Sequence, residues 1–448
     1  MTNRLAVINA LEMLTMPSGR SIARCVGWSW IVLTAPLAAM AEDWPHWRGP
    51  SRDGTTSEAS SWSGSKWLES RPAWTKVVGL GSTSPLVVDG RMYVLGWHDG
   101  QDHLQCLDAA SGKSLWTQSY ACPQYGRKAT GDEGLYGGPT GTPEYDAEGN
   151  WLYTMSVDGD LQCWDTAAGG KRVWGLNLYD EFDPPQRPRF GRSGLRDYGY
   201  TTAPLVHGNW LLVEVGDDEG TLYAFDKRTG KVQWKSQCRD EAGHTGGPLP
   251  ITVEGVPCVA VLTCKHLVVM RLDKGHEGQT IGQYEWSTDF ANNIATPTVV
   301  GNEILITSDY NRHAIVKLRA MLAGVTEVWK QPYPSKVCSP IVHDGHIYLA
   351  WQKVRCLDWA TGKLKWEGGR FGDDGSCVLT SDGWLVVWGR GTLALVDSAG
   401  RSPGAYRELA RVAGLSDADC WPHVVLAGGR IYAKDRQGKL MCFVRPSE

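Results

Sequence analysis

One phrase recurs along the chain at intervals of roughly 37–60 residues, a spacing typical of propeller and solenoid repeats. It consists of Leu or Val, any residue, Cys or Ala, an apolar residue and Asp, then a Thr/Ser-Gly-Lys turn and a tryptophan. Clean copies occupy 104–116, 222–234 and 354–366, and a copy at 161–174 has Gly169-Gly170-Lys171 as its turn. Degenerate copies end at Trp286 and Trp329, another begins at Leu393, and the last begins at Leu440 and stops with the chain. The phrase therefore predicts eight similar structural units.

A second phrase precedes each copy: a residue that opens an apolar run, a two-residue turn and a second apolar run. The opening residues are Pro85, Pro143, Pro204, Pro248, Pro297, Pro340, Cys377 and Pro422. Turns such as Asp89-Gly90 and Gly208-Asn209 favour tight hairpins. The two phrases together predict four short antiparallel strands in each unit. Since one such sheet cannot bury both of its faces alone, radial stacking of eight units predicts an all-β, eight-bladed β-propeller.

The two ends of the repeat array are complementary. The last unit lacks its tryptophan strand, whereas Trp74 stands before the first unit with no repeat of its own. We therefore predict that an N-terminal strand around Trp74 completes the eighth blade. This places the propeller at residues 72–444 and leaves 42–71 as an N-terminal extension.

The periodic tryptophans predict contacts between blades. An indole can pack on the neighbouring blade while its N–H finds a carbonyl, and the glycine of the turn can adopt a positive φ. We assign this structural role to Trp74, Trp116, Trp174, Trp234, Trp286, Trp329 and Trp366.

The N-terminus has the features of a secretion signal. Arg20 and Arg24 precede a mostly apolar stretch, 25–38, and Ala39-Met40-Ala41 forms a small-x-small cleavage site. We predict a signal peptide at residues 1–41, cleavage after Ala41, a periplasmic or secreted protein and no membrane span after cleavage.

Charge and spacing exclude several kinds of site. The formal net charge is −4, so there is no basic excess to neutralise nucleic-acid phosphates. No His-x-x-x-His or Cys-x-x-Cys spacing occurs, and no metal site is predicted.

The pairing of the cysteines stays open. Cys258 and Cys264 would be able to pair if a hairpin turn lay between them. Some pairing among Cys122, Cys238, Cys377 and Cys420 also stays open, because connectivity does not follow from sequence. Four cysteines share one repeat position and are expected to be small buried residues: Cys106, Cys163, Cys356 and Cys442.

The phrase Asp-x-x-Thr-Gly-Lys-x-x-Trp resembles the repeat of pyrroloquinoline-quinone-like propeller proteins. That family includes quinoprotein alcohol dehydrogenases and the propeller subunit of the outer-membrane β-barrel assembly machine. The opening 44–54, Trp-Pro-His-Trp-Arg-Gly-Pro-Ser-Arg-Asp-Gly, is similar to a segment found in secreted members from planctomycete-like bacteria. The vicinal Cys-Cys pair and the Cys-x-x-Cys-His haem motif of quinoprotein dehydrogenases do not occur here. The resemblance thus implies the fold and carries over no catalytic or cofactor residue.

Two segments between repeats, 117–138 and 175–199, are longer than the others, and long loops in compact folds often carry function. They join an outer strand to the next inner strand, on the face that usually holds ligand sites in propellers. Residues just before the recurring proline are expected near the axial entrance. Together these positions give a candidate ligand or partner face: Arg127, Lys128, Tyr136, Arg187, Arg189, Arg192, Arg196, Tyr198, His244, Asn292, Lys336, Asp374 and Trp421, with Asn293, Asp373 and Asp419 as weaker candidates. The alternative is a solvated cap whose arginines pair with neighbouring carboxylates.

These observations favour a non-catalytic binding or protein-interaction propeller that needs no cofactor. Its partner would be a protein, a peptide or a saccharide that approaches the long-loop face. A first alternative is a dehydrogenase for alcohols or sugars that uses pyrroloquinoline quinone with calcium. A second is a scaffold in outer-membrane protein assembly.

Overall fold

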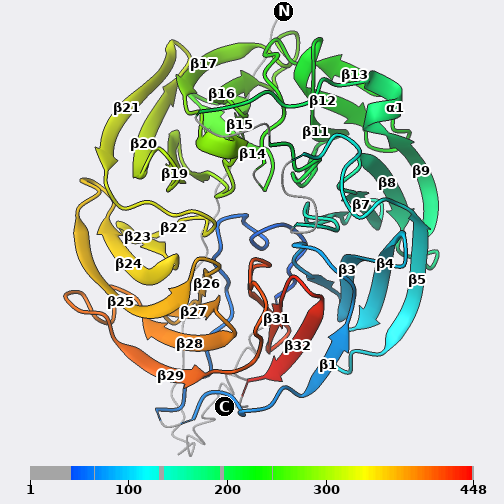
Figure 1. Cartoon of the computed structure of the whole chain (residues 1–448). Coiled ribbons are helices and arrows are strands. Elements are labelled where there is room, and N and C mark those ends of the chain that lie inside the picture. The colour runs from blue at the N-terminus through cyan, green and yellow to red at the C-terminus, as the bar shows by residue number, and fades with distance from the viewer. Residues whose placement is uncertain (1–41, 65, 131–135, 192–195, 245, 446–448) are drawn as a thin grey trace, which may run out of the picture. The chain divides into compact units, whose positions relative to one another are not determined.

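Eight four-stranded antiparallel sheets lie around a central axis (Figure 1). This computed structural model describes residues 42–64, 66–130, 136–191, 196–244 and 246–445. The predicted eight-bladed β-propeller is confirmed. The signal peptide proposed for residues 1–41 lies outside the described residues.

The strands follow the repeat boundaries, and each blade runs from an inner strand to an outer one. Blade 1 contains β2 (Leu86–Val88), β3 (Arg91–His98), β4 (Gln101–Asp108) and β5 (Ser114–Ala121), and blade 2 contains β6 (Glu144–Asp146), β7 (Trp151–Met155), β8 (Asp160–Asp165) and β9 (Lys171–Asn177). Blade 3 contains β10 (Leu205–His207), β11 (Trp210–Asp217), β12 (Gly220–Asp226) and β13 (Val232–Lys235), and blade 4 contains β14 (Leu249–Val253), β15 (Val256–Leu262), β16 (His266–Arg271) and β17 (Thr280–Glu285).

The second half of the ring repeats the pattern. Blade 5 contains β18 (Thr298–Val300), β19 (Glu303–Ser308), β20 (Ala314–Met321) and β21 (Gly324–Gln331), and blade 6 contains β22 (Ile341–His343), β23 (His346–Leu349), β24 (Gln352–Asp358) and β25 (Leu364–Gly372). Blade 7 contains β26 (Ser376–Leu379), β27 (Trp384–Gly389), β28 (Thr392–Asp397) and β29 (Glu408–Val412), and blade 8 contains β30 (Val425–Ala427), β31 (Arg430–Lys434), β32 (Lys439–Val444) and β1 (Trp74–Val77). Six of the inner strands begin at the residue after the recurring proline, which fixes φ and has no N–H to donate.

The ring closes as predicted. Strand β1 pairs antiparallel with β32, and Trp74 lies opposite Cys442. The outer strand of blade 8 therefore comes from the other end of the chain. Full closure leaves no blade with an uncovered face.

Tryptophans on the outer strands contact the turn of the next blade. Trp174 Nε1 donates to the Lys227 carbonyl at 3.1 Å, and its ring covers Gly230, where an added Cβ would lie 2.7 Å from the indole. The same contacts join Trp74 to Ala109 and Gly112, and Trp329 to Trp359 and Gly362, while Trp116 covers Gly170. Where the next blade lacks the Thr-Gly-Lys turn, the indole N–H is buried without a partner among the described residues, as at Trp234, Trp286 and Trp366.

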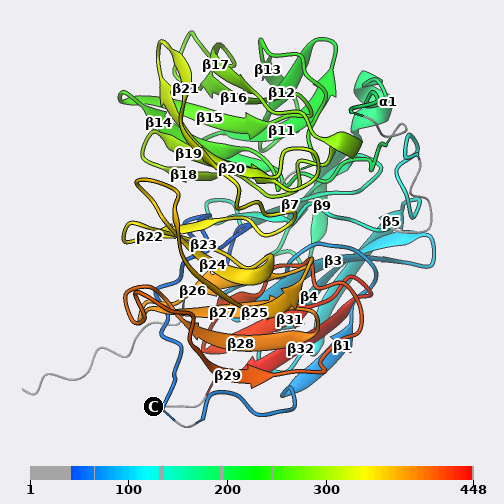
Figure 2. The same ribbon diagram turned by 60° about the vertical axis from the view of Figure 1, so that its left-hand side comes forward.

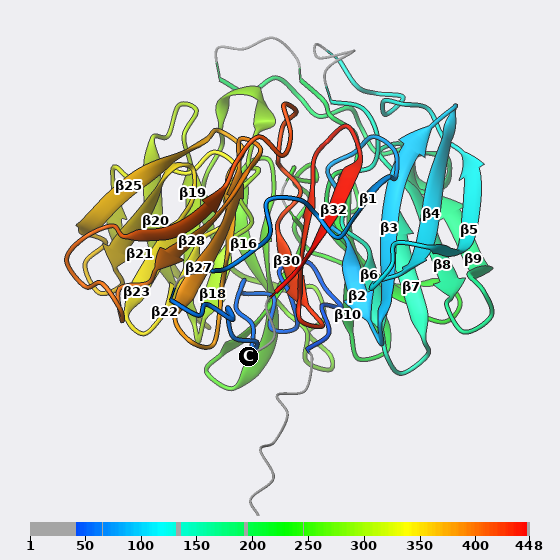
Figure 3. The same cartoon turned by 90° about the horizontal axis from the view of Figure 1, so that it is seen from below.

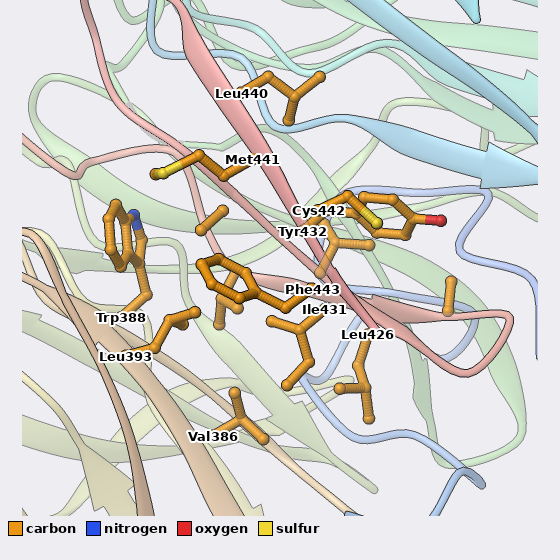
Figure 4. Close-up of a cluster of buried hydrophobic side chains, with 14 of the residues drawn as sticks. Val386, Trp388, Leu393, Leu426, Ile431, Tyr432, Leu440, Met441, Cys442 and Phe443 are labelled. Carbon is orange, nitrogen blue, oxygen red and sulfur yellow. The ribbon is translucent and has the colours of Figure 1, made fainter. Parts of the chain in front are cut away.

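Apolar side chains fill the space between neighbouring blades. Figure 4 shows one such cluster, in which Val386 and Trp388 of blade 7 face Ile431 and Phe443 of blade 8, all at most 1% exposed. Burial of apolar surface at these interfaces stabilises the ring by roughly 25 cal/mol per Å². Cysteines contribute to them as buried free thiols. Within the described residues no disulfide forms, so the open pairing of Cys258 with Cys264 is not made.

The two long segments are partly regular structure, which their composition did not predict. Strand β5 extends to Ala121, and β9 leads into a short helix, α1 (Leu178–Phe182), capped by the Asn177 side chain. Figures 1 and 2 both show α1 beside blade 3, where Phe182 packs on Tyr223 with 5.0 Å between ring centroids. A 3₁₀ turn, η1 (Asp289–Ala291), lies between blades 4 and 5. Among the described helices, none has the length and hydropathy that a membrane crossing requires.

The N-terminal extension runs beneath the ring, on the face opposite the long loops (Figure 3). Trp44 bridges to Val87 of blade 1, and Thr55 bridges to Leu379 of blade 7. Arg52 pairs with the buried Glu144 of blade 2. The extension therefore ties together blades that are remote from each other in the ring.

Arg48 anchors the middle of the extension. Its guanidinium is 1% exposed and donates to the Thr298 hydroxyl at 3.1 Å, to the Asp53 carbonyl at 2.9 Å and to the Pro340 carbonyl. Further along, Glu58 pairs with Arg445, just after β32. Arginine suits position 48 because the five N–H donors of its guanidinium can bind several acceptors at once.

Candidate functional site

A cavity of about 150 Å³ opens on the axis at the long-loop face; we call it the cup. Most of its lining comes from the connections that lead from an outer strand to the next inner strand, so each blade contributes a few side chains. The cup is lined by Trp47, Ser82, Tyr136, Thr140, Thr142, Tyr198, Thr201, His244, Gly246, Asn292, Ile294, Tyr310, Lys336, Val337, Asp373, Trp421 and His423.

Trp47 of the extension forms the floor of the cup. Its Nε1 donates to the Thr296 hydroxyl at 3.1 Å, and its ring lies 4.5 Å from the ring of His423. Gly246 makes this position possible, because an added Cβ would lie 2.2 Å from Trp47 Nε1. Trp47 thus separates the cup from the opposite face of the ring.

Two stacked aromatic rings form one wall. Tyr136 and Trp421 lie 5.2 Å apart with 27° between their planes. Arg436 covers both rings, with its guanidinium carbon 5.0 and 4.8 Å from the two centroids, and it pairs with Asp419 at 3.4 Å. A buried cation on the ring faces holds this platform in place.

The facing wall carries polar groups. Asn292 Nδ2 donates to the Tyr310 hydroxyl at 3.0 Å and to the Tyr198 hydroxyl at 3.4 Å. The Lys336 ammonium lies 5.1 Å from the Tyr310 ring centroid, and no carboxylate of the described residues lies within ion-pair distance of it. Lys336 therefore presents positive charge to the cup.

His244 has a buried ring nitrogen, Nε2, without a hydrogen-bond partner among the described residues. Its Nδ1 lies 2.8 Å from the Ala291 carbonyl, and because a carbonyl only accepts, Nδ1 carries the hydrogen. Burial lowers the pKa of His244 to about 3, and the neighbouring Arg187 lowers it further. The ring is then neutral at pH 7, and Nε2 has no hydrogen-bond partner among the described residues. Burial, together with Arg48, likewise lowers the pKa of His423 to about 3.

The structure brings six of the candidate residues together and places the other described candidates elsewhere. Tyr136, Tyr198, His244, Asn292, Lys336 and Trp421 line the cup, as does Asp373. The neighbouring Asp374 instead accepts from the backbone N–H of Cys420 at 2.7 Å. Arg192 lies outside the described residues.

The remaining described candidates belong to the long-loop connections and do not line the cup. Arg127 pairs with Asp158 at 2.7 Å, and Lys128 pairs with Asp183 at 3.2 Å. Arg189 is exposed, and Arg196 covers the Phe290 ring. The alternative of arginines paired with carboxylates thus describes several of these residues.

Arg187 is a buried anchor of the second loop. It pairs with Asp197 at 2.9 Å and donates through Nε to the Ala242 carbonyl at 2.7 Å. Burial opposes the charge on Asp197, but Arg187, His244 and the backbone N–H groups of Arg187 and Gly199 together outweigh it, and the pKa of the carboxyl is lowered. This pair holds the neighbouring Tyr198 at the wall of the cup.

Sequence reasoning missed Trp47, Tyr310 and His423. Trp47 precedes the repeats, and its partner Thr296 is 249 residues away, so no local pattern relates the two. Tyr310 lies in the turn between β19 and β20, a connection that was not considered near the axis. His423 follows Pro422, and its position beside the recurring proline was the available signal.

The quinone and calcium of the dehydrogenase alternative can be tested against the lining. Calcium takes six to eight oxygen ligands, usually with several carboxylates, whereas Asp373 is the single carboxylate among the described lining residues. Within the described residues, no group of three or more His, Cys, Asp or Glu side chains is placed to hold a metal. The aromatic platform would accept a flat ring, but the donor set does not fit the calcium.

Comparisons with known proteins agree with the repeat. A family model described as outer membrane protein assembly factor BamB matches residues 100–368. The dehydrogenase subunit of a quinone alcohol dehydrogenase from Komagataeibacter europaeus is 31% identical over 174 residues, 36% of this chain and 21% of that protein. The corresponding subunit from Acetobacter aceti is 33% identical over 163 residues. The chain thus spans about a fifth of the length of these curated relatives.

Solved structures show the same fold at low identity. BamB from Moraxella catarrhalis is 12% identical with a TM-score of 0.54, and the match covers 83% of this chain and 99% of that one. The quinohemoprotein alcohol dehydrogenase ADHIIG from Pseudomonas putida HK5 is 12% identical with a TM-score of 0.56, covering 90% and 80%. The computationally designed protein Ika8 gives 0.55 at 11% identity, covering 84% and 99%.

Proposed function

The chain belongs to the PQQ-like propeller family whose model is described as outer membrane protein assembly factor BamB, and we propose that it is a periplasmic or secreted binding propeller without catalytic activity. The cup and the long-loop face around it receive the partner, which is a protein, a peptide or a saccharide. The other face is occupied at the axis by the N-terminal extension, so the partner approaches from the long-loop side.

One observation carries this proposal: the described lining of the cup combines a fixed aromatic platform with two histidines whose pKa values lie far below neutral pH. General acid–base catalysis works best when a group titrates near the operating pH. Both lining histidines are held with pKa values near 3. The fixed platform of Tyr136 and Trp421 supports recognition, since a rigid aromatic surface loses little entropy on binding.

Binding to glycan and peptide arrays tests the proposal with the full chain after signal removal. Trp421→Ala removes the platform, while Trp62→Ala removes a partly buried tryptophan on the other face and serves as the control. We expect a wild-type signal that Trp421→Ala lowers at least tenfold and Trp62→Ala leaves unchanged. Equal signals from the two variants would contradict a partner site at the cup.

The relation to quinone alcohol dehydrogenases favours a second candidate, an oxidoreductase with a quinone in the same cup. Adding pyrroloquinoline quinone and calcium to the protein, with mixed alcohols and sugars and an artificial electron acceptor, separates the two. The binding propeller predicts no dye reduction above that of free quinone. Stoichiometric quinone binding with turnover would replace the proposed function by the dehydrogenase.

A further inference from the structure

We propose that the cup binds a sugar residue that carries a carboxylate, such as the terminal hexuronate of an oligosaccharide. This inference rests on the proposed function and names the ligand class of the same site. Two features of the cup lead to it: an aromatic platform, and a lysine on the wall that has no carboxylate within ion-pair distance among the described residues.

The platform suits a sugar ring. The negative faces of Tyr136 and Trp421 attract the slightly positive C–H groups that line one face of a pyranose. The guanidinium carbon of Arg436 lies 5.0 and 4.8 Å from the two ring centroids, and Arg436 is itself paired with Asp419. The platform therefore does not have to be ordered when the ligand arrives.

The charges favour an acid over a neutral sugar. Lys336 lies on the wall without a carboxylate partner in the described part of the chain, and Arg48 lies behind the floor with neutral oxygens as its hydrogen-bond acceptors. The carboxylate of the lining, Asp373, is exposed and accepts from Gln352 at 3.1 Å. The Lys336 ammonium attracts a bound anion, and because this side chain is only partly buried, added salt weakens that attraction.

The size of the cup limits what enters. One water needs roughly 10–15 Å³ of such space, so about 150 Å³ holds on the order of ten waters. That is comparable with the heavy atoms of a single hexose. The cup therefore takes one terminal residue, and the rest of an oligosaccharide would extend over the long-loop face.

Isothermal titration of the full chain after signal removal tests the inference. The acidic probes are disaccharides of glucuronate, galacturonate, mannuronate and guluronate, which together cover the common arrangements of hydroxyls. The neutral probes are the corresponding glucose, galactose, mannose and gulose disaccharides. We expect saturable binding of at least one acidic probe, at least tenfold tighter than its neutral counterpart, and weakened by raising NaCl from 50 to 500 mM.

Two variants and a control separate the features. Lys336→Met should remove most of the preference for the acidic probe, because it should weaken acidic binding much more than neutral binding. Trp421→Ala should weaken both probes at least tenfold. Lys363→Met, an exposed lysine in a turn of blade 6, should change neither. Retention of the full acidic preference in Lys336→Met would overturn the inference.

Other outcomes distinguish the inference from the proposed function. If no acidic probe binds but array peptides bind in a manner that depends on Trp421, the inference fails and the binding propeller stands. If no acidic probe binds and added pyrroloquinoline quinone supports turnover, both fail.

Discussion

Replacing Gly230 with alanine should cost considerably more stability than the same replacement at Gly345. Both glycines lie in turns, at φ of +71° and +72°. At Gly345 an added Cβ meets nothing within 4 Å, whereas at Gly230 it would lie 2.7 Å from the Trp174 ring. The two substitutions therefore share the backbone cost and differ in the contact between blades 2 and 3.

The magnitude follows from these contacts. An L-residue in the left-handed region costs about 1 kcal/mol, which is the whole expected effect at Gly345. At Gly230 the indole must also move, which adds about 1 kcal/mol for its hydrogen bond to Lys227 and about 1 kcal/mol or more for displaced packing. We expect a loss of about 1 kcal/mol for Gly345→Ala and about 3 kcal/mol for Gly230→Ala.

Equilibrium unfolding in urea, followed by far-ultraviolet circular dichroism, measures both variants. The same substitution is also measured in the Trp174→Leu variant. There Gly230→Ala should lower the unfolding free energy by only about 1 kcal/mol, because the ring that the new methyl group would displace is absent. Equal costs at Gly230 and Gly345, or an unchanged cost in Trp174→Leu, would refute docking of the indole as the reason for the glycine.

Three further substitutions probe buried polar groups. Burial raises the pKa of Glu214 to about 7, so between pH 4 and 8 the folded state keeps a proton that the unfolded chain releases. The unfolding free energy of the wild type should therefore fall by about 3 kcal/mol over this range, whereas that of Glu214→Gln should lack this loss. Urea unfolding at both pH values measures this, and a difference that does not vary with pH would contradict it. Asp197→Asn should cost about 3–5 kcal/mol in urea unfolding because it leaves Arg187 buried and unpaired; a loss below 1 kcal/mol would contradict the anchoring role. Arg48→Met should cost roughly 3 kcal/mol by leaving several acceptors unsatisfied and should release the extension to limited proteolysis, whereas wild-type resistance in the variant would show that the extension holds without it.

The repeat allowed the blades and the ring closure to be predicted, because every blade repeats the same local pattern. The turn around Asp226-Thr229-Gly230 and the strand at Trp74 follow from spacing alone. The cup was predicted less completely. Lys336 and Trp421 were predicted correctly because they precede a repeat boundary. Arg187 was selected as an arginine of a long loop, but its side chain is a buried anchor outside the cup.

What sequence reasoning could not supply is contact between distant segments. Trp47 becomes the floor of the cup through Thr296 and Gly246, and neither partner carries a local sign of that role. The same holds for Tyr310, which reaches the axis from a hairpin turn. Residue type and loop length identify exposed polar positions, but they do not tell which of them point toward the axis.

The route of the extension also bears on how the chain is made. Residues 42–77 contact partners that are spread from Val87 to Arg445, so neither the floor of the cup nor blade 8 can be completed before the last strand, Lys439–Val444, is available. During synthesis the earlier blades would be present before the ring is closed. Contacts between residues so far apart in the sequence form slowly. A nascent chain would therefore reach its final topology only after release, in one late step that docks both ends together.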